Sequence, residues 1–284
     1  MTTRKRFWLY TALYAFIVAM CLASLIHEDD LSLGRQPLRN LGKSLAEMSY
    51  PSFLDIWFGD PKLEYRSDDG RVLRVEDRRE VETRYLSTLG GALFTTIKIA
   101  TLGSLLAVLL GLPLGVLAAR NLHVPRPLSL FAKGVLDFCR AIHSLVFGLF
   151  FVGVIGLGPT AGILAIAIHS MGSYGKLAAE AIESTDMRPA EAIQAVGASR
   201  FAVFWFAVWP AVLPQLVSAK LYIWEFNVRD STILGLVGAG GLGLLIAESM
   251  ALFQWSRLST LILVTVAMVA FFDAASRKVR KDLL

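Results

Sequence analysis

Six long stretches that are almost free of charge constrain this chain more than any other feature. They cover residues 7–26, 99–119, 141–157, 160–175, 201–219 and 258–272, and we extend the last to 256–274. A helix of about 20 apolar residues crosses a hydrocarbon core of about 30 Å. The sequence therefore predicts an all-α membrane protein with six transmembrane helices.

The composition agrees with this prediction. Hydrophobic residues make up 55% of the chain and charged residues only 18%, whereas about 25% of a soluble domain is charged. The first stretch follows Arg4, Lys5 and Arg6 as a secretory signal would, but it exceeds the roughly 7–15 apolar residues of a signal, so we expect it to be retained. Cys21 and Cys139 provide neither a disulfide framework nor the spacing of metal ligands.

Basic residues indicate the orientation. They precede the first stretch, separate the second from the third and the fourth from the fifth, and follow the last: Arg4, Lys5, Arg6, Arg120, Arg126, Lys133, Lys176, Arg188, Arg200, Arg277, Lys278, Arg280 and Lys281. Six spans place all of them on one side, which is the cytoplasmic side. The net charge of +5 is therefore a topology signal, and no nucleic-acid partner is needed to explain it.

The segment 27–85 falls on the opposite side. Apolar residues recur at helical spacing and predict an amphipathic surface helix broken near Pro51: Leu41, Leu45, Met48, Phe53, Leu54, Trp57 and Phe58. Residues 63–76 then alternate around Asp69-Gly70, which favours a β-hairpin. We interpret the segment as a solvated addition, with a docking surface for an extracytoplasmic partner as the alternative.

Two motifs that resemble nucleotide sites carry no such function. Gly238–Gly243 fits G-x-G-x-x-G but lies in an apolar run without the strand and the acidic residue that a dinucleotide site requires. Gly172–Leu177 lacks the spacing and the final Ser or Thr of a phosphate loop. We therefore expect no cofactor in this chain and no enzymatic activity.

Isolated polar residues lie at membrane depth, where each is costly and suggests a pathway or a buried partner. We expect the cations Lys98, Arg140 and Lys220 to extend toward the interface. His143 and His169 are expected to be satisfied inside the helix bundle, with a functional role as the alternative.

A polar cluster, Asn227, Arg229 and Asp230, precedes a glycine-rich apolar run at residues 231–247. The run is too broken for an ordinary span, which predicts a re-entrant or half-membrane element. Irregular backbone is tolerated at that depth only inside protein or beside water. We therefore expect this run to line a cavity.

A short helix is predicted between the fourth and fifth stretches. Residues 178–200 are rich in helix formers, Pro189 suits a first turn, and Gly197 suits the residue just after a helix end. The helix 189–196 would be exposed on a cytoplasmic loop, where a soluble partner could hold it.

This stretch resembles the coupling motif of bacterial ABC importer permeases: Glu-Ala-Ala, three residues, Gly, nine residues, Ile-x-Leu-Pro. Glu191, Ala192, Gly197 and Pro210 match at the correct spacing. The departures, which affect packing, are Ile193 for the second Ala and Ala207 and Trp209 for Ile and Leu. The resemblance covers about 86–275 and implies the five-helix core of type I importers, here 86–277. It leaves an N-terminal helix (1–26), an extracytoplasmic insertion (27–85) and a cytoplasmic tail (278–284).

Other motifs are similar to those of the phosphonate and phosphite uptake group of these permeases. They are Arg140-Ala-Ile, Gly156-Leu-Gly-Pro159, Gly175-Lys-Leu, Gly197-Ala-Ser-Arg200, Trp224-Glu-Phe-Asn-Val-Arg229 and the run 234–243. Two departures concern cargo: His143-Ser144 replaces the usual Pro-Glu, and Asp230 replaces a small residue. They favour a small oxyanion such as phosphite or hypophosphite.

The resemblance implies a multi-pass protein of the bacterial cytoplasmic (inner) membrane, surrounded by lipid, with both termini cytoplasmic. Its partners would be a second permease copy, two cytoplasmic ATPase subunits that bind ATP and Mg²⁺, and an extracytoplasmic substrate-binding protein. The ATPases would hold the loop carrying Glu191, Ala192, Gly197 and Arg200, with Pro210 behind it. Transport would follow alternating access.

The substrate path is expected to pass Asn227, Arg229 and Asp230 and the backbone N–H groups near Gly238, Gly240 and Gly241. Glycine lets an anion approach the chain closely, and a following helix start favours negative charge. The alternative for Arg229 and Asp230 is a structural ion pair. For the whole protein the alternatives are methionine- or betaine-like cargo, an ion-coupled secondary transporter and a membrane enzyme.

Overall fold

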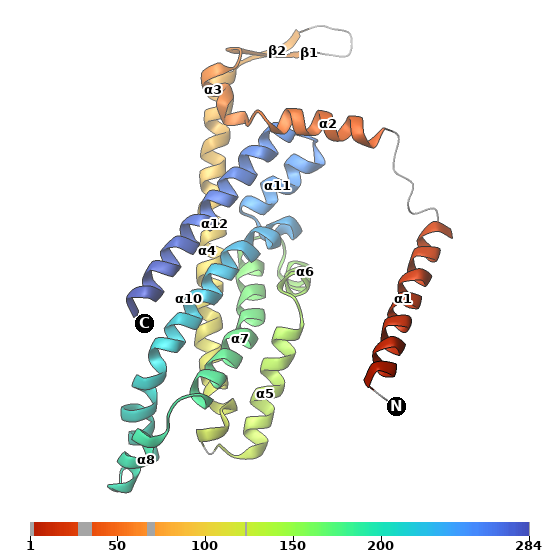
Figure 1. The fold of residues 1–284 in the computed structure, drawn as a ribbon. Coiled ribbons are helices and arrows are strands. Elements are labelled where there is room, and N and C mark those ends of the chain that lie inside the picture. Colours follow the sequence, from red (N-terminus) through yellow and green to blue (C-terminus); the bar gives the residue numbers. More distant parts are fainter. Residues whose placement is uncertain (1–2, 28–35, 67–71, 123, 284) are drawn as a thin grey trace. The chain divides into compact units, whose positions relative to one another are not determined.

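The computed structural model describes residues 3–27, 36–66, 72–122 and 124–283 (Figure 1). The described chain is helical apart from one hairpin and divides into two compact units, 1–47 and 48–284. The first unit contains α1 (Thr3–His27), whose span Arg6–Ser24 is apolar and not buried within the structure. This is the first predicted span.

The predicted amphipathic helix is present as three pieces. α2 (Pro37–Met48) has no buried residue and ends before Pro51. A 3₁₀ turn, η1 (Ser52–Leu54), and the single turn α3 (Asp55–Phe58) follow. The predicted break near Pro51 is confirmed.

A two-stranded antiparallel sheet follows, formed by β1 (Lys62–Arg66) and β2 (Val72–Asp77). The predicted hairpin is confirmed, although its turn at Asp69-Gly70 lies outside the described residues. At the base of the hairpin the Arg78 N–H donates to the Pro61 carbonyl at 3.0 Å, so the two ends of the hairpin meet.

The longest helix, α4 (Arg78–Ala118), contains 41 residues. It begins earlier than the predicted span 99–119, and the predicted domain boundary at 85/86 falls inside it. The start is set locally, because the Asp77 side chain accepts a hydrogen bond from the Arg79 N–H at 2.9 Å. Such a cap satisfies a backbone donor that a helix start leaves without a partner.

α4 packs against α7 (Pro159–Glu183), which also contacts α5, α6 and α10. The approach is close enough to require glycine: a Cβ on Gly111 would lie 2.8 Å from the Met171 carbonyl oxygen, and one on Gly115 would lie 2.6 Å from that of Gly175. Small residues at such contacts let membrane helices pack closely. α7 is thus the centre of the bundle.

The third predicted span, 141–157, is the second half of a bent pair of helices. After η2 (Arg120–Leu122), α5 (Arg126–Ala141) ends and α6 (Ser144–Ile155) begins after a break, with an angle of 88° between the two helices. The break lies at Ile142, whose backbone is extended, and at His143, which caps α6. We call this break the elbow.

The C-terminal half contains a long interrupted helix. After α8 (Arg188–Ala195) come α9 (Arg200–Val203), a π turn η3 (Phe204–Val208) and α10 (Trp209–Leu234). Pro210 has no N–H to continue an α-helical ladder, which explains a wider turn just before it. The fifth span is therefore longer than predicted. A second π turn η4 (Gly235–Ala239), α11 (Leu242–Ala251) and α12 (Trp255–Leu283) complete the chain.

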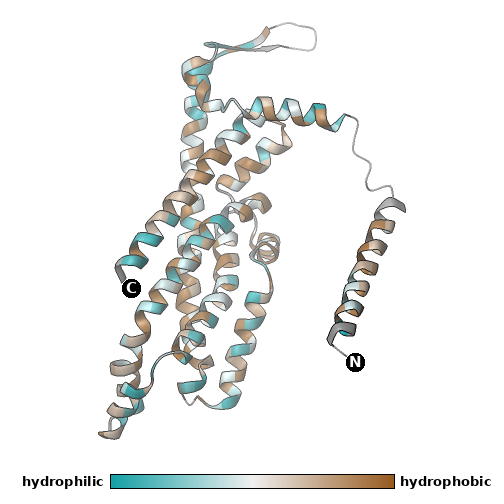
Figure 2. Cartoon of the chain, viewed as in Figure 1, coloured by the Kyte–Doolittle hydropathy of each residue, from teal (hydrophilic) through white to brown (hydrophobic). Residues whose placement is uncertain are grey.

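Four described helical segments are long and apolar enough to cross a membrane, or five if the bent pair α5–α6 counts as one: 6–24, 78–118, 200–239 and 255–281, with 126–155 as the pair. α7 covers the fourth predicted span, but its small and polar residues face neighbouring helices. Figure 2 shows the contrast between α6, which is almost wholly hydrophobic, and α12, which becomes hydrophilic toward its C-terminus.

Candidate transport site

The predicted coupling helix is present as α8. Met187 is its N-cap residue, Pro189 lies in its first turn, and Val196 ends it. Gly197 follows with φ +87°, a conformation that glycine adopts without strain. The predicted range 189–196 and the turn at Gly197 are confirmed.

α8 is attached to the bundle through one face. Ala190 is buried in a core cluster with Val208 of η3 and Val212 of α10. The side chains of Glu191 and Ala192 are exposed. This arrangement leaves the opposite face of α8 free to contact another protein.

A groove of about 390 Å³ runs beside α8 and is lined by residues of η2, α8, α9 and η3. Glu191 and Arg200, two of the predicted coupling residues, both line it. Pro210 lies in the first turn of α10 and is not among the lining residues. The structure thus brings Glu191 and Arg200 together and places Pro210 behind them.

An ion pair orders the turn that leads into α8. Arg188 donates to Asp186 through its side chain, at 2.6 Å from Nη2 to Oδ2, and its backbone N–H donates to Oδ1 at 3.0 Å. These hydrogen bonds lower the pKa of Asp186, the side-chain bond being the larger cause. Their contribution is therefore present at neutral pH and is lost as the pH falls and Asp186 is protonated.

Asn227 is fully buried and joins three helices. Its amide donates to Ser104 Oγ of α4 and its carbonyl accepts from Ser170 Oγ of α7, both at 2.8 Å. Buried amides require such partners. The structure therefore gives Asn227 a packing role, and its predicted place in the path stays a prediction.

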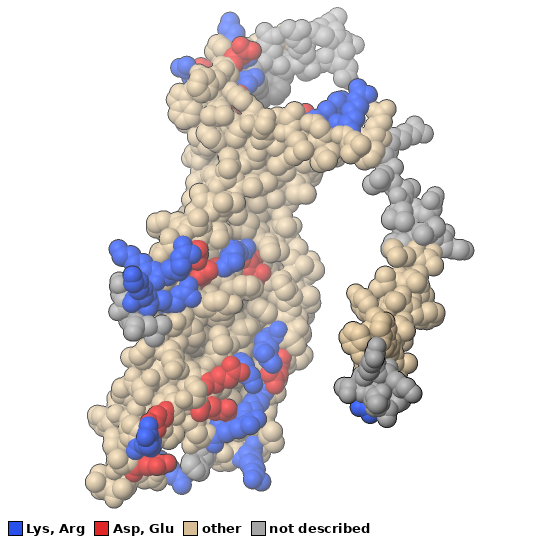
Figure 3. Space-filling model, viewed as in Figure 1, with Lys and Arg blue, Asp and Glu red and all other residues tan. Residues whose placement is uncertain are grey.

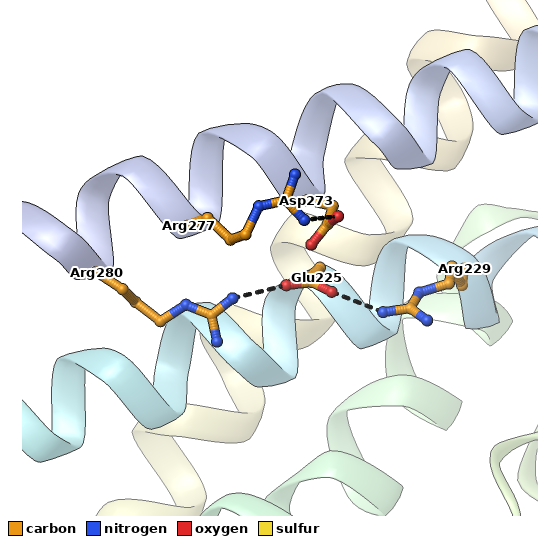
Figure 4. A network of polar contacts seen from close by, with 5 residues as sticks. All are labelled: Glu225, Arg229, Asp273, Arg277 and Arg280. Carbon is orange, nitrogen blue, oxygen red and sulfur yellow. Dashed lines mark hydrogen bonds and ion pairs between the residues drawn. The ribbon is translucent and has the colours of Figure 1, made fainter.

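Arg229 and Asp230 do not pair with each other. Successive residues on a helix point about 100° apart, and Arg229 instead donates to Glu225, one turn earlier, at 2.7 Å. Glu225 also accepts from Arg280 of α12 at 3.0 Å (Figure 4). Asp230 is 4% exposed, and its Oδ2 has no hydrogen-bond partner within the part of the chain that the structure describes.

The glycine run breaks the chain as predicted. Gly238, Gly240 and Gly241 all have positive φ, and they separate α10 from the ten-residue α11. The first N–H of α11, on Leu242, is already taken by Thr96 Oγ1 at 2.8 Å. A half-length helix is therefore confirmed, whereas anion binding at its start remains a prediction.

Sequence reasoning missed the hydroxyl groups that hold these elements. Three of these hydroxyl residues are at most 2% exposed and have apolar neighbours in sequence: Ser104, Ser170 and Thr96. A hydroxyl residue inside an apolar run was therefore the sequence signal for these contacts. Within the described ranges, no group of three or more His, Cys, Asp or Glu residues could hold a metal ion.

The apolar helices define a membrane protein with several spans, and comparisons with known proteins identify the family. Residues 111–282 match the family of binding-protein-dependent transport system inner membrane components, and the chain belongs to that family. Among solved structures, the chain is similar to an inward-facing MetNI methionine ABC transporter, with a TM-score of 0.64 and 20% identity. The match covers 71% of this chain and 98% of that one.

Two relatives from Stutzerimonas stutzeri are more similar in sequence. The phosphite transport system permease protein PtxC is 40% identical over 66% of this chain and 69% of its own length. The putative phosphite transport system permease protein HtxC is 38% identical over 65% of this chain and 66% of its own length. The matches thus span about two thirds of each of these relatives.

Proposed function

We propose that this chain is the permease subunit of an ATP-driven importer for phosphite- or phosphonate-type oxyanions. The observation that carries the proposal is the similarity to two phosphite permeases, at 38% and 40% identity. The motif Trp224–Arg229 and the glycine run, which resemble those of this group, support the same cargo class. The likeness to the methionine transporter, at 20% identity, concerns the fold.

The complex that we propose contains two permease copies, two cytoplasmic ATPases and an extracytoplasmic binding protein. One copy can line only part of a central path, which favours a pair. ATP and Mg²⁺ would bind to the ATPases, and this chain would transmit the work through α8. The free face of α8 and the groove that holds Glu191 and Arg200 support this contact.

The topology that we propose has six spans: α1, α4, the bent pair α5–α6, α7, α10 and α12. α7 crosses as a span enclosed by other helices, so it needs less apolar surface than a lipid-facing helix. The N- and C-termini are cytoplasmic, and the segment 27–85 is an extracytoplasmic insertion that extends into the start of α4. Figure 3 shows Lys and Arg residues at the C-terminal end of α12 and near α8, and also on the long segment with α2 and the hairpin. Long segments cross the membrane largely regardless of their charge, so the first two groups decide the proposed orientation.

Alternating access requires the helices to move as levers when the ATPases close. The continuous stretch from α9 through η4 extends from the loop after α8 to the glycine break, so a shift of α8 can reach Gly238. Coupling needs different contacts between α8 and the ATPase in the two states. Strong substrate recognition belongs to the binding protein, because a tight site in the path would trap the cargo.

The test is uptake by proteoliposomes that contain the chain with its own ATPase and binding protein. We expect ATP-dependent uptake of phosphite or methylphosphonate, which requires the loaded binding protein. Uptake of methionine or betaine instead would replace the proposed cargo. Uptake driven by an ion gradient without ATP would end the proposal.

A further inference from the structure

Two histidines meet at the elbow between α5 and α6. The ring centroids of His143 and His169 lie 5.9 Å apart, with 37° between the ring planes. His143 is the residue before α6 and its side chain is exposed, whereas His169 lies within α7 and is half-buried. None of the contacts described above for α8, Asn227, Arg229 and the glycine run involves these rings.

The backbone fixes which nitrogen of His143 carries the proton. Its Nδ1 accepts a hydrogen bond from the Leu145 N–H at 3.2 Å. A backbone N–H can only donate, so Nδ1 must be unprotonated. A neutral imidazole has its proton on the other nitrogen, and the Nε2–H of His143 is therefore a donor.

The opposite tautomer is fixed at His169. Its Nδ1 lies 2.8 Å from the Ile142 carbonyl oxygen. A carbonyl can only accept, so this Nδ1 carries the proton and, in the neutral ring, the Nε2 of His169 is an acceptor. The elbow therefore sets one imidazole donor beside one imidazole acceptor.

This pair suits an oxyanion that carries one proton. The monoanions of phosphite and of phosphonates have an ionised oxygen, which accepts, and a P–OH group, which donates. We propose that His143 and His169 form a cargo subsite at the elbow, with His143 Nε2–H donating to the ionised oxygen and the P–OH donating to His169 Nε2. The inference rests on the proposed function and adds a specific recognition point to it.

The ion pairs near the elbow do not involve the two rings. Arg140, one turn before the elbow, is paired with Asp137 at 2.9 Å. Among the residues that the structure describes, no carboxylate forms an ion pair with either histidine ring, so no built-in anion competes with cargo. A subsite of two side-chain hydrogen bonds also binds weakly, as release along a path requires.

The subsite distinguishes between small oxyanions. The hypophosphite monoanion has two equivalent unprotonated oxygens and no P–OH, so it can accept from His143 but has nothing to donate to His169. We therefore expect the His169 contact to favour phosphite and methylphosphonate over hypophosphite. A hydrogen bond between two uncharged groups contributes up to about 1.5 kcal/mol, which corresponds to about tenfold.

Asparagine and glutamine variants separate the two nitrogens of each ring. Asparagine can reproduce the Nδ1 contact with the backbone but is too short to reach the Nε2 position. Glutamine reaches that position but does not maintain the contact. The variants are His143→Asn, His143→Gln, His169→Asn and His169→Gln, assayed as the complete complex in proteoliposomes with phosphite- and hypophosphite-loaded binding protein.

We expect His143→Asn to lower phosphite uptake about tenfold while binding-protein-stimulated ATP hydrolysis persists. His169→Asn should lower the ratio of phosphite to hypophosphite uptake about tenfold, and this ratio does not depend on how much complex assembles. Both glutamine variants should stay within about threefold of the wild type per assembled complex. An unchanged ratio in His169→Asn, or wild-type phosphite uptake in His143→Asn, would overturn the subsite.

The two proposals fail in different ways. If the wild-type complex moves neither phosphite nor methylphosphonate, the proposed function is wrong. If it moves them and the asparagine variants match the wild type while the glutamine variants lose assembly, the histidines act only as structural contacts of the elbow.

Discussion

Glu225 of α10 accepts a hydrogen bond from Arg280 of α12, whose guanidinium lies 3.0 Å away although 55 residues separate the two in sequence. The same carboxylate accepts from Arg229 at 2.7 Å (Figure 4). The side chain of Glu225 is 9% exposed and that of Arg280 is 25% exposed. One carboxylate thus compensates two cations and joins two helices.

We predict that Glu225→Ala destabilises the complex, because it removes a largely buried carboxylate and leaves two partly exposed arginines without their counter-charge. Removal of one partner from a buried pair costs about 3–5 kcal/mol, and the partial exposure of both arginines reduces this to about 2 kcal/mol. The measurement is the thermal unfolding midpoint of the purified complex.

The matched control is Glu80→Ala. Glu80 also pairs with an arginine, Arg84, but the two side chains are 73% and 76% exposed. An exposed pair contributes about 0–1 kcal/mol. If Glu225→Ala and Glu80→Ala lower the midpoint equally, the network of Glu225 does not join the helices.

The second prediction concerns Arg229, which is half-exposed and forms one of the two ion pairs of Glu225. On the pathway hypothesis, Arg229→Gln lowers uptake while assembly and stimulated ATP hydrolysis persist, because Arg280 still holds Glu225. On the structural hypothesis, both activities fall together. Arg229 does not pair with Asp230. The change in complex stability caused by Asp230→Asn should therefore differ from that caused by Arg229→Gln. A stable Arg229→Gln complex with full uptake would exclude Arg229 from the path.

The third prediction concerns the glycine break. Thr96 is buried and accepts the first N–H of α11. Thr96→Val keeps the shape but leaves that N–H without a partner, which costs about 1–3 kcal/mol. Thr96→Ser retains the acceptor and serves as the control. We expect Thr96→Val to lower the unfolding midpoint and uptake more than Thr96→Ser does, and equal effects would show that Thr96 contributes only its volume.

The elements with local signals could be predicted from the sequence. Pro189 and Gly197 set the limits of α8, and the glycine run indicated the break after α10. The capping residue Asp77 marks the start of α4 in the sequence as well, but a prediction from apolar residues alone does not use it. Local chemistry therefore located ends of helices better than hydropathy did.

The contacts between distant elements could not be predicted. The span expected at 141–157 contains only the elbow and α6, because the charged residues of α5, among them Lys133 and Asp137, kept that helix out of the apolar stretch. The partner of Glu225 lies on another helix, so no spacing along one helix reveals it. Asn227 was assigned to the path because it is polar, whereas hydroxyls from two other helices satisfy it in the bundle.

The fourth prediction concerns coupling through α8. Glu191→Ala should leave the permease inserted but weaken ATPase attachment or stimulated hydrolysis, because Glu191 is exposed and lines the groove beside α8. Gly197→Ala should weaken coupling as well, since φ +87° costs a residue with a Cβ about 1 kcal/mol. Gly134→Ala, at an open helical position, is the control. Normal hydrolysis and uptake in both α8 variants would contradict the assignment.

The fifth prediction concerns the hairpin β1–β2. Its ends meet through the Arg78 N–H and the Pro61 carbonyl, 3.0 Å apart, so a short Gly/Ser linker can replace residues 62–76 and leave Asp77, the cap of α4, in place. The ion pair between Arg78 and Asp55, at 3.3 Å, lies outside the replaced range and keeps α3 attached to α4.

If the hairpin docks the binding protein, the linker variant should lose binding-protein-stimulated ATP hydrolysis about tenfold while basal hydrolysis stays within about twofold of the wild type, as for removal of one anchoring contact region. A solvated addition predicts no change in either rate. A variant that loses both rates equally points to a folding defect, which the unfolding midpoint would reveal. Only a selective loss of the stimulated rate, with an unchanged midpoint, supports docking.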